Sequence, residues 1–183
     1  MADITKLATQ KITKPNIEDV MPHYLDGDIL KQALEFIAYL RANKMKPSWT
    51  LHNAWKGVNK GKILYYIRLP VYASHFYRPN QPNARNWERS WCVTPYLTNI
   101  AKYEHQITDD FHRKLILQNL YGCKPHCPET QCWSNQTITV LGQDLHRFCG
   151  GTLNNRSLWI VNPDDTEMEA IKKLMEMEKR ARC

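Results

Sequence analysis

The amino-acid sequence predicts an α+β domain with a mainly antiparallel sheet, flanking helices and a small cysteine-rich metal knuckle. Three observations lead to this prediction. Apolar residues recur at helical spacing in two segments, 29–40 and 168–175. Apolar and aromatic residues alternate with period two across residues 49–69, as strands require. Four of the six cysteines fall within residues 123–149, which predicts a compact metal-binding segment.

The length of 183 residues suits one domain. We expect an N-terminal arm over residues 1–20, which lack sustained periodicity, and a single domain over residues 21–183. No apolar run approaches the roughly 20 residues that a membrane helix needs. The N-terminal residues have no apolar core of the kind that a signal peptide carries. The sequence therefore predicts a cytoplasmic globular protein that does not enter a membrane.

The first strong elements are a helix and a hairpin. The helix is expected from Ile29 to near Asn43, with Asp26 or Asp28 as its N-terminal cap. Residues 49–55 are expected to form one strand and residues 63–69 the next. Between them lies Asn59-Lys60-Gly61, whose residues tolerate positive φ and so predict the turn of a β-hairpin.

The second half should add a strand at residues 91–97 and a helix over 108–120. Thr108 is the expected cap of that helix, and Phe111, Leu115 and Leu120 should face inward. Short strands are expected at residues 137–141 and 145–149, around Gly142-Gln143, and at residues 157–161. In the last helix Asn162 should be the cap and Pro163 the first helical residue. Its apolar face should hold Met168, Ile171, Leu174 and Met175.

Positive charge is concentrated in one segment. The formal net charge is +7, yet residues 28–100 hold eleven Lys and Arg against three acidic residues. The same segment holds four of the six tryptophans. An aromatic sheet face with a counter-charge from Arg68 or Lys62 would suit a flat, apolar, anionic ligand. We name as its ligand-binding residues Trp49, Trp55, Tyr65, Tyr66, Arg68 and Trp91. The alternative is that helices cover both faces of the sheet.

Two other functions compete with this binding site. One is a small enzyme whose site lies on the aromatic sheet face, served by His75 or Arg68. The other is a single-stranded nucleic-acid binder, because basic and aromatic residues together bind phosphates and bases. The sequence has no nucleophile-elbow, phosphate-loop or dinucleotide motif. His105 and His112 flank the start of a predicted helix, where ordinary surface histidines are the favoured interpretation. The role of residues 72–89, which have no periodicity, stays open between a functional loop and a surface insertion.

The clustered cysteines predict a structural zinc site. Their order is Cys123-x3-Cys127-x4-Cys132-x16-Cys149, with His126 and His146 as reserve ligands. Thiolates suit a tetrahedral Zn²⁺, and four protein ligands leave no open position for catalysis. Reduced unligated thiols and a redox or catalytic role are the alternatives. Cys92 is expected to be a small buried hydrophobe and Cys183 an exposed thiol.

Several segments together resemble a group of short bacterial proteins of uncharacterised function. They are residues 40–47, Lys60-Gly61-Lys62 with the strand after it, the cysteine cluster leading to Leu141-Gly142-Gln143 and Cys149, and Asn162-Pro163-Asp164. The resemblance covers most of residues 21–178 and implies that the cysteines act together as a metal site. It implies no catalytic activity.

The function expected from the sequence is a non-enzymatic binding module with a structural zinc site. Its ligand would be a small aromatic or anionic molecule, or a protein partner.

Overall fold

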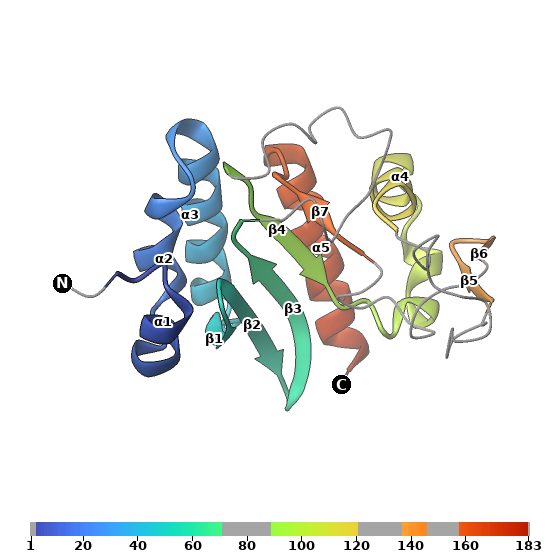
Figure 1. Cartoon of the computed structure of the whole chain (residues 1–183). Coiled ribbons are helices and arrows are strands. Elements are labelled where there is room, and N and C mark those ends of the chain that lie inside the picture. Colours follow the sequence, from blue (N-terminus) through green and yellow to red (C-terminus); the bar gives the residue numbers. More distant parts are fainter. Residues whose placement is uncertain (1–2, 71–88, 121–136, 146–157, 183) are drawn as a thin grey trace, which may run out of the picture. The chain divides into compact units, whose positions relative to one another are not determined.

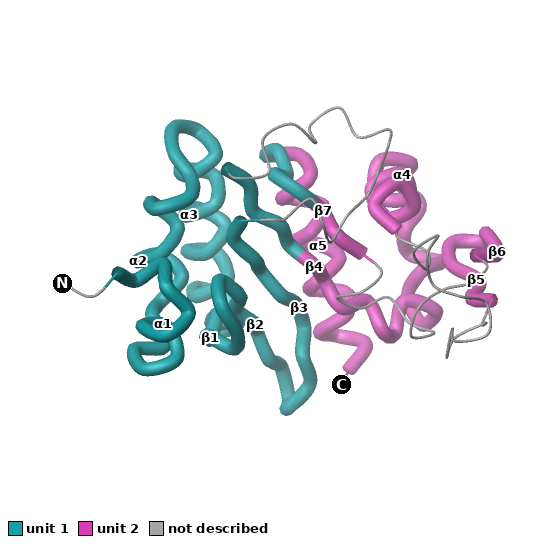
Figure 2. The backbone as a smooth tube through the Cα atoms, in the orientation of Figure 1, with its two compact units in different colours: residues 1–93, 161–165 teal, residues 94–160, 166–183 magenta. Residues whose placement is uncertain are grey.

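The structure is a computed structural model that describes residues 3–70, 89–120, 137–145 and 158–182. The chain divides into two compact units (Figure 2). Unit 1 comprises residues 1–93 and 161–165, and unit 2 comprises residues 94–160 and 166–183. The sequence led us to expect an arm at residues 1–20 and a single domain over residues 21–183. The described part of the chain does not set residues 1–20 apart from the rest of unit 1.

The elements of the described residues confirm an α+β fold with a mainly antiparallel sheet (Figure 1). Five strands form one sheet in the order β1-β2-β3-β4-β7, and two more form a separate hairpin, β5-β6. In chain order the elements are α1 (Leu7–Thr13), α2 (Ile17–Val20), the 3₁₀ turn η1 (Met21–His23), α3 (Gly27–Ala42), β1 (Ser48–Leu51), β2 (Ala54–Asn59), β3 (Lys62–Arg68), β4 (Cys92–Pro95), the 3₁₀ turns η4 (Ile100–Lys102) and η5 (Glu104–Gln106), α4 (Asp110–Gln118), β5 (Ile138–Val140), β6 (Gln143–Leu145), β7 (Ile160–Val161) and α5 (Asp165–Ala181).

Helix α3 forms where the sequence predicts it. Its buried residues, Ala33, Phe36, Ile37 and Leu40, recur at the three- and four-residue spacing of one helix face. Asp26 occupies the N-cap position, but its side chain does not cap the helix. Its carboxylate instead accepts from Arg89 Nη1 at 2.6 Å, so an ion pair replaces the predicted cap.

The β2-β3 hairpin is confirmed, including its turn. Strands β2 and β3 are antiparallel, with Asn59 paired to Lys62, and the turn residues Lys60 and Gly61 have φ of 48° and 75°. Residues 49–55 do not form one strand, however. The chain turns at Asn53, with φ 53°, so β1 and β2 run antiparallel and Trp49 pairs with Trp55.

A buried amide attaches the N-terminal helices to this turn in unit 1. Gln10 is fully buried, and its Nε2 donates to Asn53 Oδ1 at 2.5 Å. Its Oε1 accepts from the Asn53 backbone N–H at 2.8 Å and from Trp49 Nε1 at 3.2 Å. Nε2 also donates to the carbonyl of Ile4 at 2.9 Å, so the amide is well satisfied. Ile17 and Val20 are buried as well, so this segment contributes side chains to the core, although Leu7 and Ile12 stay exposed.

Gly57 of β2 lies opposite Tyr65 of β3, on the sheet face that packs against the core. The Tyr65 ring lies over the glycine so closely that a Cβ built there would overlap the ring. The ring is fully buried, and its hydroxyl donates to the carbonyl of Met45 at 2.5 Å. Gly57 therefore provides the space that the Tyr65 ring needs.

Unit 2 is built around α4 and α5. The predicted apolar face of α5 is confirmed, since Met168, Ile171, Leu174 and Met175 are all buried. The helix begins at Asp165 rather than at Pro163. The predicted cap, Asn162, lies in unit 1, where its Oδ1 accepts from the Trp91 backbone N–H at 3.0 Å.

Helix α4 also differs from the prediction at its start. Asp109, not Thr108, caps it by accepting from the Phe111 backbone N–H. Leu115 is buried as expected, whereas Phe111 is 38% exposed and Leu120 is half-buried. No helix of the described residues is long and apolar enough to cross a membrane.

We predict that Gly57→Ala lowers the free energy of unfolding by about 1–3 kcal/mol, because the added methyl group must displace the Tyr65 ring. Urea denaturation followed by circular dichroism measures the change. Val58→Thr, on the same strand at a residue 41% exposed, is the control and should stay within about 0.5 kcal/mol. Equal stability of the two variants would show that the ring does not need the glycine.

Candidate functional site

Lys56, Tyr66 and Arg68 share one face of the β2-β3 hairpin, which we call the hairpin face. Lys56 pairs with Tyr66 across the two strands, and Arg68 stands two residues beyond Tyr66 on the same side. The guanidinium carbon of Arg68 lies 5.6 Å from the centre of the Tyr66 ring, within cation–π distance. All three residues are half-buried. The hairpin face therefore combines a flat ring with two positive charges.

The sequence around the hairpin face contains no negative charge to neutralise it. No Asp or Glu stands between Glu35 and Glu88. In the same stretch, exposed lysines precede β1 and flank the hairpin turn: Lys44, Lys46, Lys60 and Lys62. Arg41 is an exception, since it forms a bidentate ion pair with Glu18 and its charge is already neutralised. A stretch of chain with several cations and no acidic residue of its own favours a positive local potential, which attracts anions.

Three of the six predicted ligand-binding residues are core residues instead. Trp55 and Tyr65 are fully buried and Trp91 is 1% exposed. Trp55 Nε1 donates to the carbonyl of Pro15 at 2.9 Å, and the Trp91 ring packs at 5.8 Å against Phe36. Because these side chains are buried, they offer no surface to a ligand. Successive strand residues point to opposite faces, so Tyr65 and Tyr66 cannot serve one site.

Trp49 is half-buried on β1 and lies opposite Trp55, on the core side of the sheet. Its indole N–H donates to Gln10, as described above. Of the six residues named from the sequence, Tyr66 and Arg68 are thus the pair that the described structure brings together on a partly exposed face. Lys56 is the residue that sequence reasoning missed. From the turn alone, where Asn59 pairs with Lys62, Lys56 would lie opposite Tyr65. Its pairing with Tyr66 follows from a register shift between Gly57 and Val58, for which a glycine inside the strand was the available signal.

The four predicted zinc ligands, Cys123, Cys127, Cys132 and Cys149, lie outside the described residues, as do His126 and His146. So do His75 and residues 72–88 of the predicted loop. Within the described ranges no three His, Cys, Asp or Glu side chains gather as a metal site would need. Cys92 is fully buried, as expected, and burial raises the pKa of its thiol to about 12. It is therefore an inert core residue.

A histidine–carboxylate pair lies at the start of α4 in unit 2. His112 Nδ1 is 2.9 Å from Asp109 Oδ2, and the other oxygen of Asp109 accepts from the Phe111 backbone N–H at 2.7 Å. The Phe111 N–H and His112 lower the pKa of Asp109, which is therefore an ionised acceptor. A carboxylate can only accept, so Nδ1 of His112 is the donor in this contact.

The structure separates the two histidines that the sequence grouped. His105 is exposed on η5, whereas His112 is only 8% exposed. The favoured interpretation of ordinary surface histidines is wrong for His112. Its Nε2 is buried and has no hydrogen-bond partner in the described part of the chain, a condition shared there with Asn59 Oδ1.

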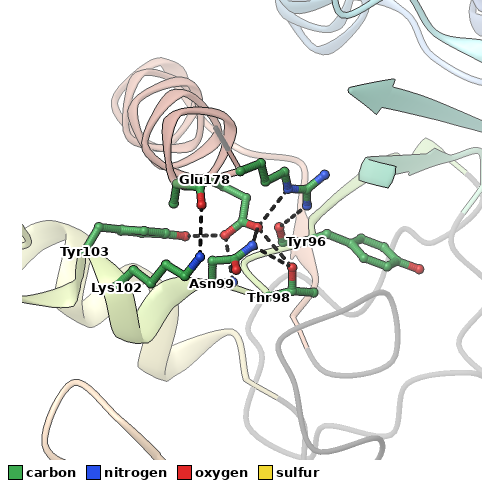
Figure 3. Close-up of polar contacts among 8 residues, drawn as sticks. Tyr96, Thr98, Asn99, Lys102, Tyr103 and Glu178 are labelled. Carbon is green, nitrogen blue, oxygen red and sulfur yellow. Dashed lines mark hydrogen bonds and ion pairs between the residues drawn. The ribbon is translucent and has the colours of Figure 1, made fainter. Parts of the chain in front are cut away.

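In the described part of unit 2, the Glu178 side chain of α5 is hydrogen-bonded to Thr98, Asn99, Tyr103 and Arg182 (Figure 3). It is fully buried, and its carboxylate accepts from both Thr98 and Asn99 side chains, at 3.0 and 2.7 Å, and from the Asn99 backbone N–H at 3.0 Å. Tyr103 Oη donates at 3.0 Å and Arg182 Nε at 2.9 Å. Burial and the neighbouring carboxylate raise the pKa of Tyr103, which therefore stays a donor.

This cluster is structural. Its buried charges are paired, and every acceptor position on the carboxylate is used for contacts that hold α5 against residues 98–103. Sequence reasoning missed it, although Glu178 continues the spacing of Ile171 and Met175 along α5. A charged residue on an apolar helix face was the available signal.

Comparison with protein-family models, curated proteins and solved structures found no significant match to this chain.

We predict that Glu178→Gln lowers the free energy of unfolding by about 3–5 kcal/mol, because it leaves the Arg182 guanidinium buried without its counter-charge. Glu169→Gln is the matched control on the same helix. Its side chain is 66% exposed and pairs with Lys172, so its loss should cost less than about 1 kcal/mol. Urea denaturation of both variants tests this, and similar losses for the two would refute the structural role of Glu178.

Proposed function

We propose that the chain is a non-enzymatic binding module whose hairpin face takes a small anionic ligand with a planar group. The observation that carries the proposal is the arrangement of Arg68 over the Tyr66 ring with Lys56 as the cross-strand neighbour of that ring. A planar group can stack on a tyrosine ring, and two cations beside it can meet an anionic substituent.

Backbone geometry supports this assignment. The three side chains stand on two hydrogen-bonded strands, so their spacing is held by the sheet. The register at these residues is set by the Lys60-Gly61 turn together with the shift of pairing between Gly57 and Val58. Sites on strands are more precise than sites on loops. The stretch between Glu35 and Glu88 carries lysines and arginines and no Asp or Glu, so its own charge is positive.

We also propose, from the sequence, that Cys123, Cys127, Cys132 and Cys149 hold a structural Zn²⁺. Four thiolates and one zinc ion would lower the formal charge of +7 to about +5. The expected outcome is one zinc per chain by elemental analysis of the purified protein. Removal of the metal by a chelator should also unfold the segment. Protein without stoichiometric metal, whose thiols all titrate in the folded state, would refute this site.

The binding prediction is tested with three probes that separate ring from charge. Adenosine monophosphate carries both, adenosine only the ring, and inorganic phosphate only the charge. We expect adenosine monophosphate to bind measurably more tightly than either of the others in calorimetric titrations, because only it uses Tyr66 and both cations. Binding of none of the three, or equal binding of all, contradicts the proposal.

Variants then locate the site. Lys56→Gln and Arg68→Gln should each weaken the binding of adenosine monophosphate about tenfold, since a hydrogen bond to a charged group contributes about 1.5–3 kcal/mol. Lys31→Gln is the charge-matched control, on an exposed residue of α3 in the same unit. Equal losses in all three variants would indicate a non-specific charge effect. A steep dependence on salt with oligonucleotides would instead favour the nucleic-acid function.

A further inference from the structure

Two exposed aliphatic side chains extend the hairpin face over the outer strands of the sheet. Leu51 of β1 is 59% exposed and Val58 of β2 is 41% exposed. Leu51 is paired with Ala54, and residues 54, 56 and 58 of β2 share one side of the strand by alternation. The extra residue of the register shift near Gly57 lies on β3, so the alternation within β2 is unbroken. Leu51, Lys56 and Val58 therefore stand on the same face, in that order along β2.

Lys56 places a positive charge between these two side chains. It is half-buried, and within the described residues its ammonium group has no ion pair. A cation that has lost part of its water gains from contact with an anionic group. The exposed lysines of the turn, Lys60 and Lys62, add positive charge at one end of the same two strands. Along β2 the surface thus offers an apolar, a cationic and an apolar group.

The spacing of these groups matches one side of an α-helix laid along β2. Every second residue of a strand advances about 6.6 Å, and every fourth residue of a helix advances about 6.0 Å. Helix positions i, i+4 and i+8 also share one face. An extended segment has a similar spacing, but on the face of a sheet its backbone N–H and C=O groups would find no strand edge to pair with. A helix pairs those groups internally and is the better fit.

Charge decides between a partner protein and a second copy of this chain. In a symmetric dimer the same patch meets itself, so Lys56 of one copy would approach Lys56 of the other. Such an approach of like charges is unfavourable. A helix with an acidic residue at its middle position instead pairs with Lys56, while its outer positions bury Leu51 and Val58.

We propose that Leu51, Lys56 and Val58 form a docking surface for an acidic amphipathic helix of a partner protein. The pattern that fits this surface has an apolar residue at i, Glu or Asp at i+4, and an apolar residue at i+8. The docking surface shares Lys56 with the proposed small-ligand site but does not use Tyr66 or Arg68. The inference goes beyond that site and does not depend on it.

Titration of the full chain with fluorescently labelled peptides, followed by anisotropy, tests the docking surface. The acidic peptide is an alanine- and glutamine-rich helix of about 18 residues, with Leu at i and i+8 and Glu at i+4. The control peptide has Lys in place of that Glu. The acidic peptide should bind at least about tenfold more tightly, because its carboxylate pairs with Lys56 where the control repels it.

Variants then locate the binding. Leu51→Gln and Val58→Thr should each weaken binding of the acidic peptide about fivefold, because less apolar surface is buried. Lys56→Gln should remove most of the preference for the acidic peptide over the control. Ile12→Gln, at a residue 85% exposed on α1 of the same unit, should leave binding unchanged. All four residues are at least partly exposed, so the variants should fold, and circular dichroism checks this.

The outcomes keep this proposal apart from the small-ligand site. Losses in Leu51→Gln and Val58→Thr but not in Ile12→Gln, with the preference lost in Lys56→Gln, support the docking surface. No binding of the acidic peptide, equal binding of both peptides, or an equal loss in Ile12→Gln overturns it. Adenosine monophosphate should bind Leu51→Gln as it binds the wild type. Wild-type protein that binds the acidic peptide but not adenosine monophosphate overturns the small-ligand site alone.

Discussion

The alternation of side chains along the β2-β3 hairpin is the constraint on which unit 1 depends. Trp55 and Tyr65 point to the core, and Lys56, Tyr66 and Arg68 point to the other face. The turn at Lys60-Gly61 and the one-residue shift of pairing between Gly57 and Val58 together set the register. Without that shift, the faces of β2 and β3 would not match as they do. The register of β2 and β3 therefore determines both which side chains pack in the core and which lie on the hairpin face. Gly57 belongs to it as well, because it lets the Tyr65 ring lie across β2.

Buried polar side chains then decide which segments pack together within each unit. In unit 1 the Gln10 amide joins α1 to the β1-β2 turn, and in unit 2 the Glu178 carboxylate joins α5 to residues 98–103. Both side chains have their hydrogen bonds satisfied. Each network of hydrogen bonds can form in only one arrangement of the backbone. Such contacts contribute specificity more than net stability. His112 differs from both, since one of its polar atoms has no described partner.

Periodicity accounts for what the sequence predicted well. Helix α3, the β2-β3 turn and the apolar face of α5 follow from spacing alone, because their residues interact with near neighbours in the chain. The misses depend on contacts distant in sequence. Gln10, in residues 7–20, hydrogen-bonds to Asn53. Asp26 pairs with Arg89 instead of capping α3. Asn162 accepts a hydrogen bond from the Trp91 backbone instead of capping α5. At the candidate site, Tyr66 and Arg68 were predictable, whereas Lys56 required the register and His112 required its burial.

Charge acts locally in this protein, so its total is a poor guide to what it binds. Screening at physiological salt limits the reach of an exposed charge to about 8 Å, which makes neighbouring side chains more important than the sum of +7. On the hairpin face Lys56 and Arg68 both lie beside the Tyr66 ring. Arg41 is neutralised by Glu18 and contributes little to the electrostatic potential there. A zinc ion bound by the four clustered thiolates would change the charge of unit 2, to which those cysteines belong.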